Sequence, residues 1–552
     1  MLKVSAPNAA LALLTISLVF VVLFWRLGTP TFWDPDEAHY AETTREMIAT
    51  ADWSAPFYND QPFFDKPVLF HQLQGIAMRL ISDPELGARL VPALAALGLV
   101  AITWWFGVVM VSRDVGIVAA LMLAACPGVF GLARYAILDT LFTMFLFGGA
   151  ACLAVAALGD RPRLQWLGYV AIGFGVQTKG PLALVLCGLA MVLLMSCSAD
   201  LRRRLLGLHW VLGLAIVAAV SSWWFIYMYV RFKEQFVNGY VLDENVRLFA
   251  ASRFANQPGF SFYLQILAAA LLPWTGLLLG RLIDDVRAVL RGERLDGVET
   301  VLWGWTAAVV GFFTLSTFKL DHYVFPAAPA LCLLCARAWT DLRTAPERSR
   351  HGATRVGFYL IGPLLVLAGI VCAYLLRVRL ALPAGAAVVP AALIATGAVA
   401  AVASVLRRAH PPRVPWLVTG ALIATYAGLI LFVLPAFEQR KVVPDVAGWV
   451  ASHAQPSDRI ASFRLNRWNP AYRFYVGRHT AFLDDADQAA AFFGSAQPFY
   501  CVMRSSDYDE FVARGVRLTV VYEREGMWAT SGRALWRSAA PLARFVVVSG
   551  GR

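Results

Sequence analysis

The stretch ARLVPALAALGLVAITWWFGVVMV, residues 88–111, decides the fold class, because its 24 residues carry a single charge, Arg89. A helix needs about 20 apolar residues to cross the hydrocarbon core of a bilayer. The whole chain of 552 residues has this character: 59% of it is apolar and 15% is charged, whereas soluble proteins are roughly 25% charged. This composition excludes a soluble globule, a disordered chain and a disulfide scaffold, and predicts an integral membrane protein.

Apolar runs of similar length recur along the chain and predict an all-α polytopic membrane bundle with about 13 transmembrane helices. The predicted spans are 8–25, 88–111, 115–132, 137–158, 165–178, 180–197, 206–230, 260–280, 300–318, 322–339, 354–376, 381–405 and 414–435. Thr178-Lys179-Gly180-Pro181 separates the fifth span from the sixth and allows either a tight turn or a broken helix. A poor cleavage site follows the first run, so we expect this run to be retained rather than cleaved as a signal peptide.

Basic residues are divided unevenly between the two sides of the predicted bundle. The short loops on the N-terminal side carry 19 Lys and Arg residues, and the short loops on the other side carry five. Positive loops stay in the cytoplasm, so we expect a cytoplasmic N-terminus and, with an odd number of spans, an exported C-terminus. Most of the net charge of +12 is therefore topological, and no nucleic-acid partner is indicated.

The outer side holds a loop over 28–87, a second loop over 231–259 and the tail. We expect residues 1–437 to form the membrane domain and residues 438–552 a small soluble α/β domain. Strand-like pieces in the tail at 459–464, 498–504, 516–523 and 543–549 alternate with helical ones such as 485–493. No dinucleotide-binding, Walker or EF-hand motif occurs in the sequence.

The first outer loop predicts two helices at the membrane surface. Trp33-Asp34-Pro35-Asp36-Glu37-Ala38-His39-Tyr40 begins a helix that runs to Met47, with Asp34 as N-cap and Pro35 in the first turn. Acidic residues in a first turn commonly serve only as caps, but such a helix would also point Asp36 at any cavity in the bundle. The amphipathic run 68–81 predicts an interfacial helix, beside which Lys66 could instead extend to lipid headgroups.

At least five outer segments place a Lys or Arg at the membrane surface, where the topology rule predicts few. These residues are Lys66, Arg134, Lys179, Arg247 and Lys319. Their clustering indicates an anionic ligand, most simply a phosphate at the bilayer surface. Asp139 opens the fourth span, which favours either a functional role or a helix cap. Asp65, His39 and His322 share this side and leave a divalent metal open, although no HxH or HxxxH spacing occurs.

The outer segments resemble those of a known family in both motif and order. Pro35-Asp36-Glu37, Tyr40-Ala41-Glu42, Arg45-Glu46-Met47, Asp52-Trp53 and Phe64-Asp65-Lys66-Pro67 resemble the first extracytoplasmic loop of polyprenyl-phosphosugar glycosyltransferases related to the protein O-mannosyltransferases. Thr178-Lys179-Gly180, Glu244-Asn245-Val246-Arg247, Leu272-Pro273-Trp274-Thr275 and Lys319 with Tyr323 and Pro326 follow in the family's order. The likeness covers most of residues 30–330 and, within the family, is to the lipid A aminoarabinose transferases. Asp65 and Leu248 depart from an expected Glu and Phe, which bears on the sugar and acceptor more than on the class.

The resemblance implies a GT-C glycosyltransferase in the bacterial inner membrane, with its cavity on the periplasmic side. It implies that aminoarabinose moves from undecaprenyl phosphate to a lipid A phosphate with inversion, giving resistance to cationic peptides such as polymyxin. Asp36 is the expected catalytic residue, assisted by Glu37 and Asp139. The expected substrate-binding residues are Tyr40, Lys66, Arg134, Lys179, Arg247, Lys319 and Tyr323.

The role of Asp36 depends on the acceptor. An ionised phosphate is already nucleophilic, so Asp36 would orient it or bind the amino group of the sugar, and no cofactor would be required. A serine or threonine hydroxyl would instead need Asp36 as general base. The alternatives left open are the same enzyme class with another sugar or a protein hydroxyl acceptor, and a lipid or sugar transporter that performs no chemistry.

Overall fold

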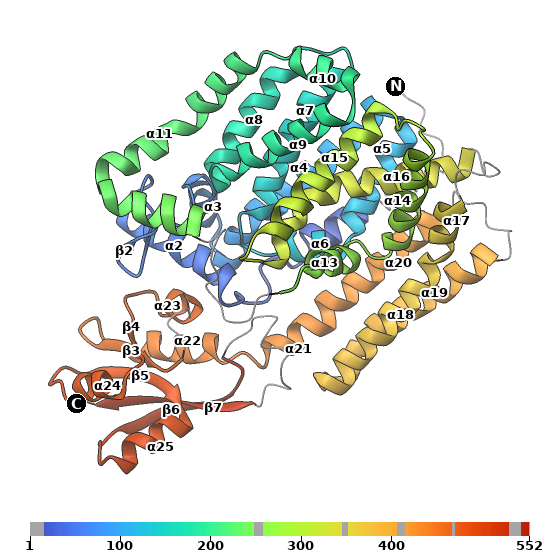
Figure 1. Ribbon diagram of the computed structural model, residues 1–552. Coiled ribbons are helices and arrows are strands. Elements are labelled where there is room, and N and C mark those ends of the chain that lie inside the picture. Colours follow the sequence, from blue (N-terminus) through green and yellow to red (C-terminus); the bar gives the residue numbers. More distant parts are fainter. Residues whose placement is uncertain are drawn as a thin grey trace.

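The computed structural model describes residues 16–247, 258–344, 352–405, 414–465, 470–528 and 542–550. The predicted first span, 8–25, lies partly outside these residues, and a helix is present over 16–23. Most of the described chain before residue 438 forms a bundle of apolar helices, and the tail forms a separate sheet at one end of it (Figure 1). The predicted fold class, an all-α membrane bundle with a small α/β tail, is therefore confirmed.

The bundle contains helices of very different length. They are α4 (Pro84–Met110), α5 (Arg113–Ala125), α6 (Pro127–Ala133), α7 (Asp139–Leu158), α8 (Leu164–Lys179), α9 (Leu182–Cys197), α10 (Ala199–Leu206), α11 (Trp210–Phe236), η1 (Val237–Arg247), α13 (Phe262–Ala270), α14 (Thr275–Leu290), α15 (Gly297–Leu315), η2 (Asp321–Ala327), α16 (Ala328–Thr344), α17 (Gly352–Tyr359), α18 (Ile361–Ala373), η4 (Tyr374–Arg379), η5 (Ala384–Ala387), α19 (Val388–Val405), α20 (Val414–Gly428), η7 (Leu429–Val433) and α21 (Leu434–Glu438). Among the described residues, eight helices are long and apolar enough to cross a membrane, or nine if one bent pair forms a single span. The chain is a multi-pass membrane protein, and the count of 13 spans stays a prediction.

Two predicted spans are broken at a proline. The prediction of one helix over 260–280 is wrong: α13 ends at Ala270 and α14 begins at Thr275, with Pro273 between them. The third predicted span bends by 63° between α5 and α6, next to Pro127. Proline has no N–H to donate and its ring clashes with the preceding turn. Between α8 and α9, Gly180 has a φ of +82°, so the Thr178–Pro181 segment forms a tight turn.

The first outer loop forms the two predicted surface helices. They are α2 (Asp36–Thr50) and α3 (Leu69–Leu80), with the short hairpin β1 (Phe57–Tyr58) and β2 (Gln61–Pro62) between them. The predicted cap is wrong by one residue, because the N-cap of α2 is Pro35, which has no side-chain capping hydrogen bond. Asp34 Oδ1 accepts instead from the backbone N–H of Ala471 at 3.1 Å, which lies in the tail.

The tail contains a mixed five-stranded sheet in the order β4-β3-β5-β7-β6. The strands are β3 (Arg459–Phe463), β4 (Ala481–Leu483), β5 (Phe499–Arg504), β6 (Thr519–Gly526) and β7 (Ala543–Gly550), and the helices are α22 (Val443–His453), α23 (Pro470–Val476), α24 (Ala486–Phe493) and α25 (Ser505–Ala513). The predicted strands and the predicted helix over 485–493 are present. The strand expected from residue 516 begins three residues later, at Thr519. Gly515, just after the end of α25, has a φ of +79°, which is typical of the glycine that follows a helix.

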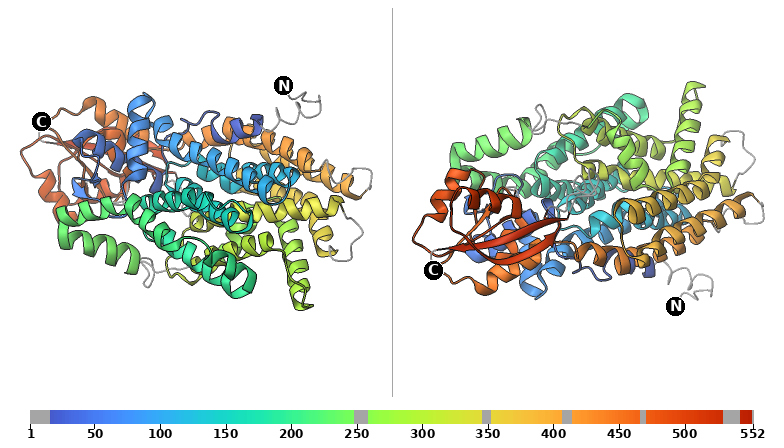
Figure 2. Two further views of the ribbon diagram at one scale, coloured as in Figure 1. Left: turned by 90° about the horizontal axis from the view of Figure 1, so that it is seen from above. Right: turned by 90° about the horizontal axis from the view of Figure 1, so that it is seen from below.

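Helices cover both faces of the tail sheet. Successive residues of a strand point to opposite faces, so Tyr500 and Val502 pack with residues of α22 and α23, and Phe499, Cys501 and Met503 pack with residues of α24 and α25. The first of these cores also includes Phe32, Ala38 and Ala41 from the first outer loop. Two further views show the tail and this loop together at one end of the bundle (Figure 2).

Candidate functional site

A small polar cavity lies where the surface helices meet the ends of the membrane helices. Its volume is about 150 Å³. It is lined by Asp36, His39, Tyr40, Phe63, Asp65, Lys66, Ile137, Asp139, Lys179, Glu244, Phe318, Leu320, His322 and Tyr323. Most of the residues predicted from the sequence to bind substrate or perform chemistry therefore lie around one space, although they come from segments up to 287 residues apart.

One side of the cavity is a buried ion pair between two membrane helices. Asp139 begins α7, Lys179 ends α8, and the Lys179 ammonium donates a hydrogen bond to Asp139. The same ammonium lies 4.5 Å from the ring centroid of Tyr323. The antiparallel pairing of α7 and α8 brings the two charges together, and burial strengthens their attraction.

A second, looser ion pair also lines the cavity. Lys66 Nζ donates to Glu244 Oε2 at 3.3 Å and to the carbonyl oxygen of Asp65 at 2.8 Å. The Lys66 side chain is 16% exposed. A phosphate carries more charge than a single carboxylate and presents three acceptor oxygens, so it can replace Glu244 as the partner of Lys66.

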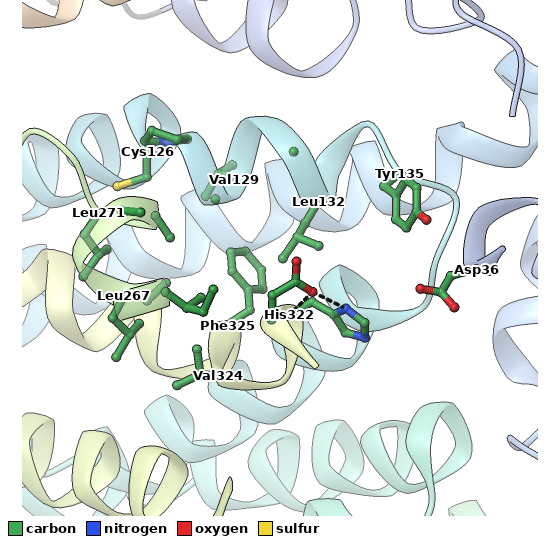
Figure 3. Close-up of a pocket in the computed structure, with 18 of the residues that line it drawn as sticks. Asp36, Cys126, Val129, Leu132, Tyr135, Leu267, Leu271, His322, Val324 and Phe325 are labelled. Atoms are coloured by element: carbon green, nitrogen blue, oxygen red, sulfur yellow. Dashed lines mark hydrogen bonds and ion pairs between the residues drawn. The ribbon is translucent and has the colours of Figure 1, made fainter. Parts of the chain in front are cut away.

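A larger apolar groove of about 610 Å³ begins at the edge of the polar cavity. Figure 3 shows Asp36 and Tyr135 at one end of this groove and Cys126 and Leu271 at the other. Its walls come mainly from α6, α13 and η2, and a Cβ atom at Gly131 of α6 would meet no atom within 4 Å. This shape suits a hydrocarbon chain.

Asp36 and His322 line both the polar cavity and the apolar groove. Burial, more than the nearby Asp321 and Asp139, raises the pKa of Asp36, and His322 opposes this increase. His322 Nδ1 lies 3.2 Å from Asp321 Oδ1, and its Nε2 lies 3.6 Å from Asp139 Oδ2. The polar cavity and the apolar groove, the two compartments of the site, therefore meet at the carboxylate of Asp36 and the imidazole of His322.

Two of the predicted site residues lie outside the cavity and bind other parts of the protein. The Glu37 side chain is completely buried and accepts hydrogen bonds from Arg89 Nε at 2.6 Å and Arg89 Nη2 at 2.9 Å. It also accepts from the backbone N–H groups of Trp33 and Ala136, each at 2.9 Å. Glu37 follows Asp36 by one residue, so it points about 100° away around the helix. Arg134 donates to the carbonyl oxygen of Arg26 at 3.0 Å, near the end of the first membrane helix.

Two further predicted basic residues do not line the cavity either. The Arg247 side chain is 68% exposed and pairs with Asp243 one turn earlier in η1. Lys319 is buried and donates to the carbonyl oxygen of Ser316. Its neighbours Phe318 and Leu320 line the cavity instead, because successive residues of this extended segment point in different directions.

Glu244 and Asp321 are two acidic residues that the sequence did not assign to the site. Glu244 lines the polar cavity, and Asp321 lines the groove beside His322. Each lies next to another ionisable residue in an outer segment, and this adjacency was the feature of the sequence that could have assigned them to the site. The family-like motif Glu244-Asn245-Val246-Arg247 includes Glu244 and leaves out Asp243, whose carboxylate pairs with exposed Arg247.

The three residues considered for a metal, Asp65, His39 and His322, all line the polar cavity. Within the described ranges, no group of three or more His, Cys, Asp or Glu side chains is arranged to hold a metal ion. Burial, together with the positive charge of Lys66, lowers the pKa of His39 to about 4. His39 is therefore neutral at pH 7 and adds no positive charge to the cavity.

Comparisons with known proteins agree with this architecture. Residues 12–236 match the sequence model of the dolichyl-phosphate-mannose-protein mannosyltransferase family. The chain is 31% identical over 356 residues to the undecaprenyl phosphate-alpha-4-amino-4-deoxy-L-arabinose arabinosyl transferase of Aeromonas hydrophila and 26% identical over 381 residues to that of Enterobacter sp.. These matches cover 63% and 66% of the chain and 62% and 65% of the two relatives, so they span just under two thirds of each relative's length.

A solved structure has the same fold over nearly the whole chain. The crystal structure of ArnT from Cupriavidus metallidurans bound to undecaprenyl phosphate superposes with a TM-score of 0.74. The alignment covers 98% of each chain at 22% sequence identity. The fold implied by the sequence resemblance is thereby confirmed for the helical bundle, and the alignment also includes the tail, whose α/β fold was predicted from its own residue pattern.

Proposed function

We propose that this chain is a glycosyltransferase of the superfamily related to the protein O-mannosyltransferases, and that it transfers aminoarabinose from undecaprenyl phosphate to a lipid A phosphate. The observation that carries the proposal is the meeting of the two compartments at Asp36 and His322. An enzyme that moves a sugar between two lipids needs space for a hydrocarbon chain directly beside a polar site with cations. The curated relatives support the choice of sugar and carrier, because their names state both.

In the proposed reaction, an oxygen of the acceptor phosphate attacks the anomeric carbon of the sugar. The bond from that carbon to undecaprenyl phosphate breaks, and the leaving phosphate takes the electron pair. The configuration at the carbon inverts. Lys66 and Lys179 neutralise the leaving phosphate, which lowers the barrier most in a site where little water screens their charge. These two ammonium groups supply the positive charge, so the proposed step requires no resident metal ion.

Asp36 orients the reactants in this proposal. The acceptor phosphate is mostly ionised near pH 7, because its second pKa is near 6, so no strong base is needed. Four carboxylates line the polar cavity, from Asp36, Asp65, Asp139 and Glu244, against the two lysines. This excess of negative charge suits a sugar that carries a cationic amino group, which Asp36 can hold by a charge-assisted hydrogen bond.

We further propose that the protein lies in the bacterial inner membrane with its N-terminus in the cytoplasm and its tail in the periplasm. The uneven distribution of basic residues between the loops supports this orientation. The cavity, the first outer loop and the tail then all face the periplasm. We assign residues 1–437 to the membrane domain and residues 438–552 to the periplasmic domain.

The test is mass spectrometry of lipid A from a strain that makes the donor but lacks its own aminoarabinose transferase. Expression of the wild-type chain should add a mass equal to one aminoarabinose, and the Asp36→Asn variant, expressed to the same level, should add none. Unmodified lipid A in cells with well-expressed wild-type protein would refute the proposed acceptor or sugar. Exported glycoproteins from the same cells would then be examined for added sugar, which tests the protein-hydroxyl alternative.

A further inference from the structure

A buried arginine connects the tail to the helix that carries Asp36. Arg473 lies in α23, and only 2% of its surface is exposed. Its Nε donates to Glu42 Oε1 at 2.8 Å and to Glu46 Oε1 at 2.9 Å. Both glutamates belong to α2, and both are buried. One guanidinium of the tail therefore contacts both of these carboxylates on the helix that begins with Asp36, and Arg45 of the same helix also donates to Glu42, at 2.6 and 2.8 Å.

The same guanidinium also fixes the hairpin that follows α2. Arg473 Nη1 donates to the side-chain oxygen of Asn59. Glu46 in turn accepts from the backbone N–H groups of Asn59 at 2.7 Å and Asp60 at 3.2 Å. Arginine can hold several acceptors at once because its donors form a rigid planar fork, which lysine lacks.

The two faces of α2 have different partners. At about 100° per residue, the Glu42 and Glu46 face lies about 120° around the helix axis from the face with Asp36 and Tyr40. Asp36 and Tyr40 line the polar cavity, whereas Glu42 and Glu46 contact the tail. A rotation or shift of α2 that broke the arginine contacts would therefore move Asp36 within the cavity.

The segment just before Asp36 is held by the tail as well. The backbone N–H of Ala471 donates to Asp34 at 3.1 Å, and the Tyr475 hydroxyl accepts from the N–H of Phe32 at 2.8 Å while donating to Glu85 at 2.7 Å. Ala471, Arg473 and Tyr475 all belong to α23. This short helix thus contacts the chain on both sides of Asp36.

We propose that Arg473 is a positioning residue for Asp36, and that the tail is for this reason part of the catalytic apparatus. The inference rests on the proposed function, because it assigns Arg473 a role in that transfer. Arg473 touches neither compartment itself and acts through α2. A displacement of about 1 Å in a catalytic group can slow a reaction about 100-fold, so the geometry of α2 is expected to control turnover.

The test measures kcat and the donor KM of the purified full-length chain with undecaprenyl-phosphate-linked aminoarabinose and lipid A, together with the melting temperature. Arg473→Met should lower kcat by about 100-fold and change the donor KM by less than about threefold, because Lys66 and Lys179 remain in place. Arg473→Lys should restore part of kcat but not all of it, since an ammonium keeps the charge without the fork. The control is Arg464→Met, another tail arginine, whose exposed side chain pairs with Asp507 and Glu510 of the tail; its kcat should be unchanged.

The outcomes separate this inference from the proposed function. An inactive wild-type protein refutes the proposed function, whereas an active wild type with an equally active Arg473→Met variant refutes only the role of Arg473. If Arg473→Met and Arg473→Lys both lose kcat, donor binding and melting temperature to the same extent as each other, Arg473 has a purely stabilising role and the inference is overturned. If Arg473→Met does not fold, Glu46→Gln perturbs the same contact from α2, and a selective loss of kcat in that variant is the expected result.

Discussion

The adjacent acidic residues Asp36 and Glu37 should respond to substitution in opposite ways. Both begin α2, but Asp36 lines the cavity and the groove, whereas Glu37 is paired with Arg89 inside the protein. We therefore expect Asp36→Asn to lose transfer and keep its stability, and Glu37→Gln to lose stability first. Each substitution replaces one carboxylate oxygen by an NH2 group and leaves the side-chain size nearly unchanged.

The size of the stability loss follows from the contacts of Arg89. Arg89 is 1% exposed and donates to Glu37 and to the carbonyl oxygens of Leu27, Pro30 and Thr31. Removing one member of a buried ion pair leaves the other charge uncompensated and costs about 3–5 kcal/mol. Glu37→Gln leaves the buried charge of Arg89 uncompensated, and Arg89→Met leaves the buried charge of Glu37 uncompensated. The double variant removes both charges, so it should be less destabilised than the sum of the single variants by about 0.5–3 kcal/mol.

The assay compares thermal unfolding of the detergent-solubilised protein with sugar transfer measured well below the melting temperature. Glu37→Gln should melt roughly 6–10 °C below the wild type, taking about 2 °C per kcal/mol for a large domain, and should retain transfer while folded. Asp36→Asn should melt like the wild type and lose transfer by at least about 100-fold. A Glu37→Gln variant that melts like the wild type but transfers as slowly as Asp36→Asn would refute the structural role of Glu37.

Three further predictions concern the phosphate, the pH and the groove. Lys66→Ala should weaken binding of undecaprenyl phosphate by about tenfold or more, because one charge-assisted contact contributes about 1.5–3 kcal/mol; unchanged binding in a titration would exclude Lys66 from the donor site. Burial raises the pKa of Asp34 from 3.8 to about 7, so the stability contributed by the protonated carboxyl is present below pH 3.8 and lost as the pH rises through about 7. At about 1.36 kcal/mol per pKa unit, the wild type should lose up to about 4 kcal/mol across this window, and Asp34→Asn should lack this loss; parallel melting curves from pH 4 to 8 would contradict the shift. A Cβ atom at Gly131 would meet no atom within 4 Å, so Gly131→Phe should fill the groove and raise the donor KM about tenfold, whereas Gly188→Phe, which is equally open but does not line the groove, should leave KM unchanged.

The sequence predicted much of the fold because the responsible signals are local. A bilayer requires long apolar runs whatever their neighbours are, and the amphipathic run 68–81 contains its own evidence for a surface helix. The predicted break at Thr178-Lys179-Gly180-Pro181 could not be assigned to a turn or a kinked helix from composition alone. The break at Pro273 was missed because the apolar run continues on both sides of it.

The gathering of charged outer residues was also predictable in outline. Membrane topology places Asp36, Lys66, Asp139 and Lys179 on the same side, and an ion pair between helix ends is the least costly arrangement for buried charges. Lys179 and Asp139 do form such a pair. Which outer basic residues line the cavity was not predictable, because Arg247 and Lys319 satisfy the same sequence rule and face elsewhere.

By itself, the sequence determined that this protein is a helical membrane bundle with charged residues concentrated at its outer surface and a small α/β tail. Only the tertiary structure decided that Glu37 lies outside the cavity that Asp36 lines, because Glu37 pairs with Arg89, 52 residues away. It likewise decided that α2 is held by Arg473, 431 residues from Glu42. The physical reason is that the direction of a side chain depends on helix rotation, and the rotation of α2 is set by partners that are distant in the sequence and adjacent only after folding.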